Sequence, residues 1–174
     1  MIQTIFIDRD GTLLDEPITE IINSWDKFKI KNDIHCLAKL LSEYKFFIIS
    51  NQEGINEGKL EQEFYDNTNK KLLSALGEHG IKIEQIYTCP HVMEENCDCR
   101  KPKTGLIEQA TKDFQIDRQK SWIIGDRISD IKLAETVGMK SIFIQSELHK
   151  IGDNKPNFVA VNLCEAVEYI TKNL

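Results

Sequence analysis

The sequence lacks an excess of positive charge and any long hydrophobic run. Its 174 residues carry a net charge of −6 at pH 7, so no overall field attracts nucleic acid or an anionic membrane. No segment approaches the roughly 20 apolar residues that a membrane span needs, and the first residues lack the basic flank of a signal peptide. Repeats, low-complexity segments and linkers are also absent. We therefore expect a cytoplasmic protein without nucleic-acid or membrane partners, either a monomer or a weak homodimer.

The composition is that of an ordinary globular domain, with 41% hydrophobic and 29% charged residues. A chain of this length can bury one core, so we expect residues 1–174 to form a single domain. Short apolar runs alternate with segments of helical periodicity. The expected strands are residues 3–7, 45–50, 83–88, 121–126 and 140–145, and the expected helices are residues 33–44, 61–79, 106–114, 130–138 and 163–174. This alternation predicts an α/β fold with three layers, in which helices cover both faces of a parallel sheet.

Polar residues that can support chemistry follow four of the expected strands. In a parallel sheet the ligand site lies beyond the carboxyl ends of the strands, so these residues should meet there. They are Asp8, Asp10 and Thr12 after the first strand, Ser50 and Asn51 after the second, Arg100 and Lys101 after the third, and Asp126 and Asp130 at the fourth.

Such a group of side chains suits phosphoryl transfer. Converging carboxylates repel one another and require a cation, and oxygen ligands suit magnesium. A hydroxyl, backbone N–H groups and a lysine suit the oxygens of a phosphoryl group. Asp8 and Asp10 are two residues apart, so an extended segment places them on one face. One carboxylate can then attack phosphorus while the other transfers protons. Solvated loop carboxylates and helix caps explain each motif singly, but not all four together.

The segments DRDGT, SNQ, CRKP and GDRISD resemble, in order, the four motifs of the haloacid dehalogenase (HAD) superfamily. The resemblance extends from about Ile5 to Gln145. It implies a Rossmann-like HAD fold without a cap domain, since only about forty residues separate Asp8 from Ser50. It also implies a magnesium-dependent phosphatase that acts on a small phosphorylated metabolite.

The resemblance also implies a role for each matching residue. Asp8 would be the nucleophile, Asp10 the general acid and base, and Lys101 the residue that neutralises the charge of Asp8 and the phosphate. Ser50 and the N–H of Asn51 would hold the phosphate. Magnesium would be bound by Asp8, Asp126 and the backbone carbonyl of Asp10. Asp130 would support the site rather than bind the metal.

A cluster of soft ligands precedes Lys101, with the spacing Cys89-x-His91-x5-Cys97-x-Cys99. These four residues match a closed, structural zinc site of Cys3His type. A disulfide would leave one of the three cysteines unpaired, and reduced thiols beside a surface histidine are the remaining alternative. We expect Zn²⁺ to fix this loop at residues 89–99 and thereby place Lys101 opposite Asp8. Arg100 would then touch the phosphate or the leaving group.

The CPH…CDCRKP arrangement resembles a HAD subgroup that contains histidinol-phosphate phosphatases and D,D-heptose 1,7-bisphosphate phosphatases. The short gap between His91 and Cys97 favours the first branch, whereas GINEGKLEQEF is closer to the second. Histidinol phosphate carries cationic groups, so we expect Glu16 in the segment after Asp10 to hold the substrate cation. A sugar bisphosphate would instead require additional cations in the site.

Two further alternatives stay open at this stage. A related branch with the DxDGT motif removes 3′-phosphates from nucleic acids, which the acidic net charge disfavours. A non-catalytic phosphate-binding scaffold is the alternative of another class, although both Asp8 and Asp10 are present. His149 has no expected partners, and Cys36 and Cys164 are expected in core packing or at the surface.

Overall fold

The computed structural model describes residues 1–174 and contains one six-stranded parallel sheet in the order β3-β2-β1-β4-β5-β6. Its strands are β1 (Thr4–Asp8), β2 (Lys45–Asn51), β3 (Ile83–Cys89), β4 (Trp122–Gly125), β5 (Lys140–Ile144) and β6 (Phe158–Ala160). β1 lies at the centre and pairs with both β2 and β4. This confirms the expected parallel α/β fold and brings the carboxyl ends of β1, β2 and β4 to one edge of the sheet.

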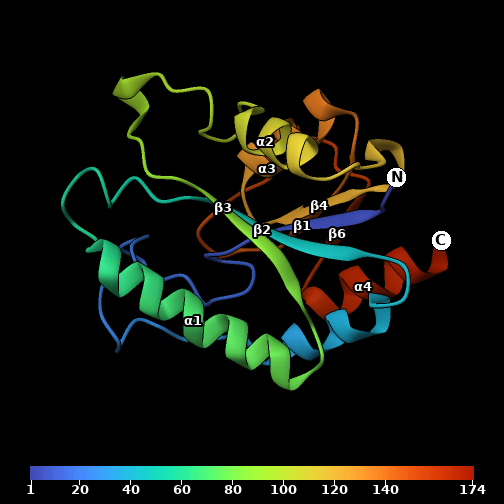
Figure 1. Ribbon diagram of the computed structural model, residues 1–174, viewed down its shortest axis with the longest axis horizontal. Helices are drawn as coiled ribbons and strands as arrows, with labels where there is room; N and C mark the ends of the chain where they lie inside the picture. The colour runs from blue at the N-terminus through green and yellow to red at the C-terminus, as the bar shows by residue number, and fades with distance from the viewer.

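Helices cover both faces of the sheet (Figure 1). One face carries α2 (Gly105–Asp113) and α3 (Ile128–Val137), and the other carries α1 (Gln62–Glu78), η1 (Asn32–Leu40) and α4 (Leu163–Lys172). Two hydrophobic clusters of 24 and 14 buried residues fill the two interfaces. Strand side chains alternate between them, since Ile5 and Ile7 belong to the first cluster and Phe6 to the second.

Two elements differ from the sequence-based expectation. The expected helix at residues 33–44 is a 3-10 helix, η1, whose buried Ile34, Leu37 and Leu40 recur every third residue, the period of that helix. The sixth strand, β6, was not predicted, because three residues are too few to show a periodicity. Further short 3-10 helices are η2 (Met93–Glu95) and η3 (Arg118–Lys120).

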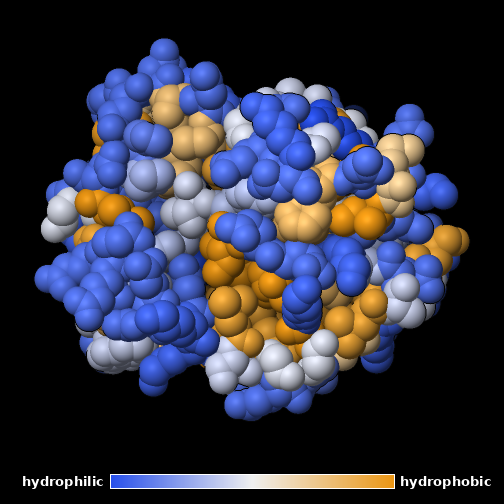
Figure 2. Space-filling model, in the orientation of Figure 1, coloured by the Kyte–Doolittle hydropathy of each residue, from blue (hydrophilic) through white to orange (hydrophobic).

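No inserted domain lies between β1 and β2, where η1 is the only helix. The site at the strand ends is therefore bordered by loops. Hydrophilic residues cover much of the surface in Figure 2, and hydrophobic atoms show between α1 and α4. None of the helices combines the length and hydrophobicity that a membrane crossing requires.

Cys36 of η1 and Cys164 of α4 form a disulfide across 128 residues of sequence. The sequence analysis did not foresee this bond, because only the packing of α4 against η1 brings the two thiols together. The other three cysteines, Cys89, Cys97 and Cys99, are free.

Candidate active site and metal centres

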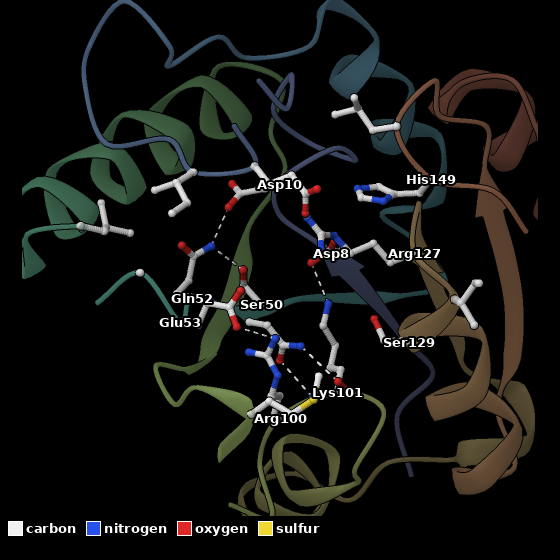
Figure 3. A pocket seen from close by; sticks show the side chains of 18 of the residues that line it. Asp8, Asp10, Ser50, Gln52, Glu53, Arg100, Lys101, Arg127, Ser129 and His149 are labelled. Atoms are coloured by element: carbon white, nitrogen blue, oxygen red, sulfur yellow. Dashed lines mark hydrogen bonds and ion pairs between the residues drawn. The ribbon is translucent and has the colours of Figure 1, made fainter. Parts of the chain in front are cut away.

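A cavity of about 680 Å³ lies at the carboxyl ends of the central strands. Asp8, Asp10, Ser50, Asn51 and Lys101 all line it, so the structure brings together the residues that the sequence analysis expected to meet. Figure 3 shows four of them, Asp8, Asp10, Ser50 and Lys101, at the cavity; they come from the end of β1 and the residues after it, from β2 and from the loop that precedes α2. The cavity is lined mainly by polar and charged residues.

Lys101 lies at the base of this cavity in a group that we call the carboxylate centre: Lys101, Asp8, Asp126 and Asp130. The Lys101 Nζ lies 2.7 Å from Asp8 Oδ1, 2.7 Å from Asp130 Oδ1 and 3.1 Å from the Ile49 carbonyl oxygen. These three acceptors match the three donors of an ammonium group. Burial alone would lower the pKa of Lys101, but Asp130 and Asp8 raise it well above its usual value, so Lys101 stays protonated.

Asp126 lacks a partner for one of its oxygens. Its side chain is fully buried, Oδ2 accepts no hydrogen bond, and Oδ1 lies 3.4 Å from the Thr12 hydroxyl. Burial, together with the charges of Asp8, Asp130 and Glu16, raises the pKa of Asp126 to about 8. A buried carboxylate without a partner is unfavourable unless a cation neutralises it.

The carboxylate centre offers a set of oxygen donors that fits a hard divalent cation. Oxygens of Asp8, Asp126 and Asp130 lie within 4.8 Å of one another. Magnesium prefers carboxylate and carbonyl oxygens and retains water molecules. Burial also raises the pKa of Asp130, to about 6, although Lys101 opposes the shift. Asp130 already accepts hydrogen bonds from Lys101 and from the Arg127 N–H, so Asp8 and Asp126 are the carboxylates better placed for a metal.

Two glycines allow the backbone to approach these carboxylates. A Cβ atom added to Gly11 would lie 2.2 Å from Asp126 Oδ2, and one added to Gly125 would lie 2.2 Å from Asp130 Oδ2. Gly11 also has a φ of +88°, which other residues rarely adopt. The glycine of the DRDGT segment is therefore required by both its conformation and the packing of Asp126.

Asp10 is held on both of its carboxylate oxygens. Arg9 Nη1 donates to Oδ1 at 2.6 Å, and Gln52 Nε2 donates to Oδ2 at 2.6 Å. Gln52 Nε2 also donates to Ser50 Oγ at 2.7 Å, so it links Asp10 to the hydroxyl expected to hold phosphate. Gln52 belongs to the SNQ segment, but the sequence analysis gave it no role.

Asn51 fixes the position of Lys101 by two hydrogen bonds. Its side-chain oxygen accepts from the Lys101 N–H at 3.0 Å, and its Nδ2 donates to the Lys101 carbonyl oxygen at 3.1 Å. The end of β2 therefore holds the backbone of the lysine directly. The family resemblance implied a role only for the backbone N–H of Asn51, and a side-chain contact across 50 residues leaves no sequence signal.

The cysteine loop, residues 89–99, brings Cys89, His91, Cys97 and Cys99 together, with their ligand atoms within 4.8 Å of one another. Cys99 Sγ lies 3.0 Å from Cys89 Sγ, 3.2 Å from His91 Nδ1 and 3.5 Å from Cys97 Sγ. A single ion can reach all four atoms at once. Three thiolates and one imidazole form a donor set that suits tetrahedral zinc.

The cysteine loop is bonded to the residues that follow it. Arg100 Nη1 donates to the His91 carbonyl oxygen at 3.1 Å, and Lys103 Nζ donates to the Cys97 carbonyl oxygen at 2.7 Å. Arg100 Nη2 also lies 2.6 Å from Glu53 Oε2, which joins the loop to the segment after β2. The residues before and after Lys101 in this segment, Arg100 and Lys103, are therefore both held by contacts with the cysteine loop.

The contacts of Glu16 differ from those that the sequence analysis expected. Expected to hold a substrate cation, it instead contacts two side chains of the protein, the Arg127 guanidinium and the His149 imidazole, and its own side chain is only 3% exposed. Burial would lower the pKa of Arg127, but Glu16 and Asp8 raise it. His149, expected to have no partners, lies 2.7 Å from Glu16 and lines the cavity. Residues 16 and 149 are too far apart in the sequence for this pair to be foreseen.

Comparison with known proteins finds similarity in the family models, in curated relatives and in solved structures. The model of the HAD-hydrolase-like family matches residues 98–166. The histidine biosynthesis bifunctional protein HisB of Actinobacillus pleuropneumoniae is 42% identical over 141 residues, which cover 80% of this chain and 39% of that protein. HisB of Campylobacter jejuni is 39% identical over 141 residues, with 79% and 40% covered. The chain thus spans about two fifths of the length of these relatives.

The solved structures show the same fold. A D,D-heptose 1,7-bisphosphate phosphatase from B. bronchiseptica, crystallised with magnesium and phosphate, superposes with a TM-score of 0.90 at 21% identity, covering 99% of this chain and 100% of that one. The enzyme of that name from Burkholderia thailandensis gives 0.69 at 17% identity, covering 97% and 98%. The chain is thus similar to HAD-hydrolase-like proteins over residues 98–166, and it shares its fold with phosphatases of known structure.

Proposed function

We propose that residues 1–174 form one phosphatase domain, which hydrolyses the phosphomonoester of a small metabolite through an aspartyl-phosphate on Asp8. The observation that carries the proposal is the arrangement of Asp8, which is held by Lys101 at the base of an open, polar cavity. Ser50 and Asp10 line the same cavity. A nucleophile, a phosphate ligand and a proton donor therefore face one volume.

In the first step, a carboxylate oxygen of Asp8 attacks phosphorus and the bond between phosphorus and the ester oxygen breaks. Asp10 gives its proton to the leaving alkoxide, which departs as the alcohol. In the second step, Asp10 takes a proton from water while the water oxygen attacks phosphorus. The bond between Asp8 and phosphorus then breaks, and inorganic phosphate leaves.

Lys101 balances the negative charge of Asp8 and the incoming phosphate, and the Ser50 hydroxyl and the Asn51 N–H hold the phosphate oxygens. Magnesium would be held by Asp8, Asp126 and the Asp10 carbonyl, and it would supply positive charge beside the transferring phosphoryl group. Zinc would be held by Cys89, His91, Cys97 and Cys99 and would fix the cysteine loop. Arg100, bonded to that loop, would contact the phosphate or the leaving group.

Release of inorganic phosphate from a panel of phosphomonoesters, with and without Mg²⁺, tests the proposal. Phosphate release that requires Mg²⁺ is the expected result. A protein that binds phosphate but hydrolyses no member of the panel would instead be a phosphate-binding scaffold.

For the substrate, we propose histidinol phosphate, as in cytoplasmic histidine biosynthesis. The proposal is supported by the HisB relatives, which are far more similar in sequence than the heptose phosphatases. The cavity wall also carries Glu20, Glu53 and Glu57. Glu20 and Glu53 are 52% and 45% exposed and pair with arginines. Exposed ion pairs are weak, so a substrate cation can compete for these carboxylates. Glu16 is less available, because its side chain is only 3% exposed and contacts both Arg127 and His149.

A second candidate is D,D-heptose 1,7-bisphosphate. It is favoured by cations that also line the cavity, Lys59, Arg100 and Lys150, which could hold a second phosphate. Measuring kcat/KM for both compounds in parallel separates the two. A higher value for the heptose bisphosphate would overturn the choice of histidinol phosphate.

A further inference from the structure

Arg9, between Asp8 and Asp10, is a buried charged residue: its side chain is only 1% exposed. Its guanidinium is satisfied in three directions. Nε donates to Asn69 Oδ1 at 2.8 Å, Nη2 donates to Thr68 Oγ1 at 2.6 Å, and Nη1 donates to Asp10 Oδ1 at 2.6 Å. A buried charge needs such partners to offset its loss of hydration.

Helix α1 supplies two of these partners and fixes the guanidinium. The Thr68 hydroxyl donates its own proton to the Tyr65 carbonyl oxygen at 2.7 Å, which directs a lone pair toward Arg9. Arg9 also lies 4.8 Å from the centre of the Tyr65 ring, a geometry that favours a cation. Only a planar group with several donors can meet acceptors on three sides, so lysine could not replace arginine here.

The remaining partner, Asp10, is thereby held in one orientation. Arg9 engages Oδ1, and Oδ2 is directed toward Gln52 and Ser50 at the cavity. Figure 3 shows the line of contacts from Asp10 through Gln52 to Ser50. Thr68 and Asn69 do not line the cavity, so the whole support lies behind Asp10.

We propose that Arg9 is a positioning residue, anchored by Thr68 and Asn69, that holds Asp10 so that Oδ2 faces the leaving group. The inference rests on the proposed function, because Asp10 must be the general acid. Oδ2 carries the proton that passes to the ester oxygen as its bond to phosphorus breaks. Arg9 stays charged throughout and exchanges no proton. The geometry of proton transfer thus depends on a helix that contributes nothing else to the reaction.

Two leaving groups provide the test. A nitrophenolate departs without being protonated, whereas an alkoxide needs a proton from the general acid. The double variant Thr68→Val/Asn69→Ala should lower kcat/KM for glycerol phosphate by roughly 10- to 100-fold, part of the usual contribution of a general acid. With para-nitrophenyl phosphate, the loss should stay below about threefold. The value of kcat/KM reports the steps up to departure of the leaving group, so slow hydrolysis of the aspartyl-phosphate does not mask a defect in proton transfer.

Three matched variants complete the experiment. Thr68→Ser keeps the hydroxyl and should behave like wild type, as should Lys70→Ala on the exposed face of α1. Arg9→Lys keeps the charge but has one nitrogen, and should repeat the selective loss if the double variant does not fold. Equal losses on both substrates, or none, would overturn the role of Arg9. A wild-type protein that releases phosphate from neither of these compounds nor from histidinol phosphate would instead overturn the proposed function.

Discussion

The carboxylate centre and the cysteine loop each gather four side chains at one point, but they do so by different routes. The ligand atoms of the loop come from eleven consecutive residues, Cys89 to Cys99. The carboxylate centre draws its residues from the ends of β1 and β4, from α3 and from the loop before α2. One group is local in the sequence, and the other exists only when the sheet has formed.

The two regions also differ in their charge balance. The carboxylate centre holds one lysine and three buried aspartates; Lys101 bonds Asp8 and Asp130, and Asp126 Oδ2 accepts no hydrogen bond. In the cysteine loop three cysteine side chains and an imidazole lie in contact, and bound protons are released when a metal binds. The carboxylate centre therefore concentrates negative charge, whereas we propose that the cysteine loop fixes the position of Lys101. Removing each charge or ligand should separate these roles.

Substitution of Asp8 by Asn should have the largest effect. It keeps the shape but removes the nucleophile and the charge that Lys101 balances, so phosphate release should fall by about 10⁴-fold or more. The measurement is kcat at saturating substrate with Mg²⁺ present. Asp8→Asn should still bind phosphate, and full activity in this variant would exclude an aspartyl-phosphate.

Substitution of Asp126 by Asn should lower Mg²⁺-dependent activity by about 10³-fold, since a metal stabilises the transition state by several kcal/mol. The same change should stabilise the metal-free protein. The pKa of Asp126 is raised from 3.8 to about 8, so between these values the folded state binds a proton that the unfolded state does not. Wild-type stability should therefore fall as the pH rises through this window.

Thermal unfolding at pH 6 and pH 8.5 without metal measures this effect. Wild type should lose more stability between the two pH values than Asp126→Asn, and Mg²⁺ should restore wild type alone. If the two proteins lose the same stability between these pH values, the ionisation of Asp126 does not destabilise the folded protein.

Removal of zinc should have a smaller effect, about 10- to 100-fold on kcat, because the loop acts only by placing Arg100 and Lys101. Excess Mg²⁺ should not restore the activity of chelated protein, whereas Zn²⁺ should. Cys97→Ser, which removes one ligand, should reproduce the loss. If zinc-free protein keeps its full kcat, the cysteine loop contributes only to stability, and of the two regions only the carboxylate centre acts in catalysis.

Glu53→Gln should have the smallest effect. Glu53 pairs with Arg100 at the contact between the loop and the segment after β2. If it exchanges this partner for a substrate cation, KM for histidinol phosphate should rise about threefold, the range of an exposed ion pair. Glycerol phosphate carries no cation and should keep its KM. A matching rise for both substrates would mean that Glu53 acts through Arg100.

The sequence by itself determined the parallel α/β class, five of the six strands and the four segments that form the site. It could do so because buried parallel strands are continuously apolar and because their carboxyl ends must share one edge. It also grouped the cysteine loop, whose residues are neighbours along the chain. β6 escaped prediction because three residues, Phe158–Ala160, show no period, and η1 was assigned the wrong helical type.

Only the tertiary structure decided how the site residues are paired. Asn51 with Lys101, Arg9 with Thr68 and Asn69, Glu16 with His149, and Cys36 with Cys164 are all contacts between segments far apart in the sequence. Charged side chains on a linear sequence have many candidate partners, and burial selects among them by removing the competing water. Glu16 is an example. Its sequence position near the site suggested a contact with substrate, but in the folded protein its carboxylate contacts Arg127 and His149.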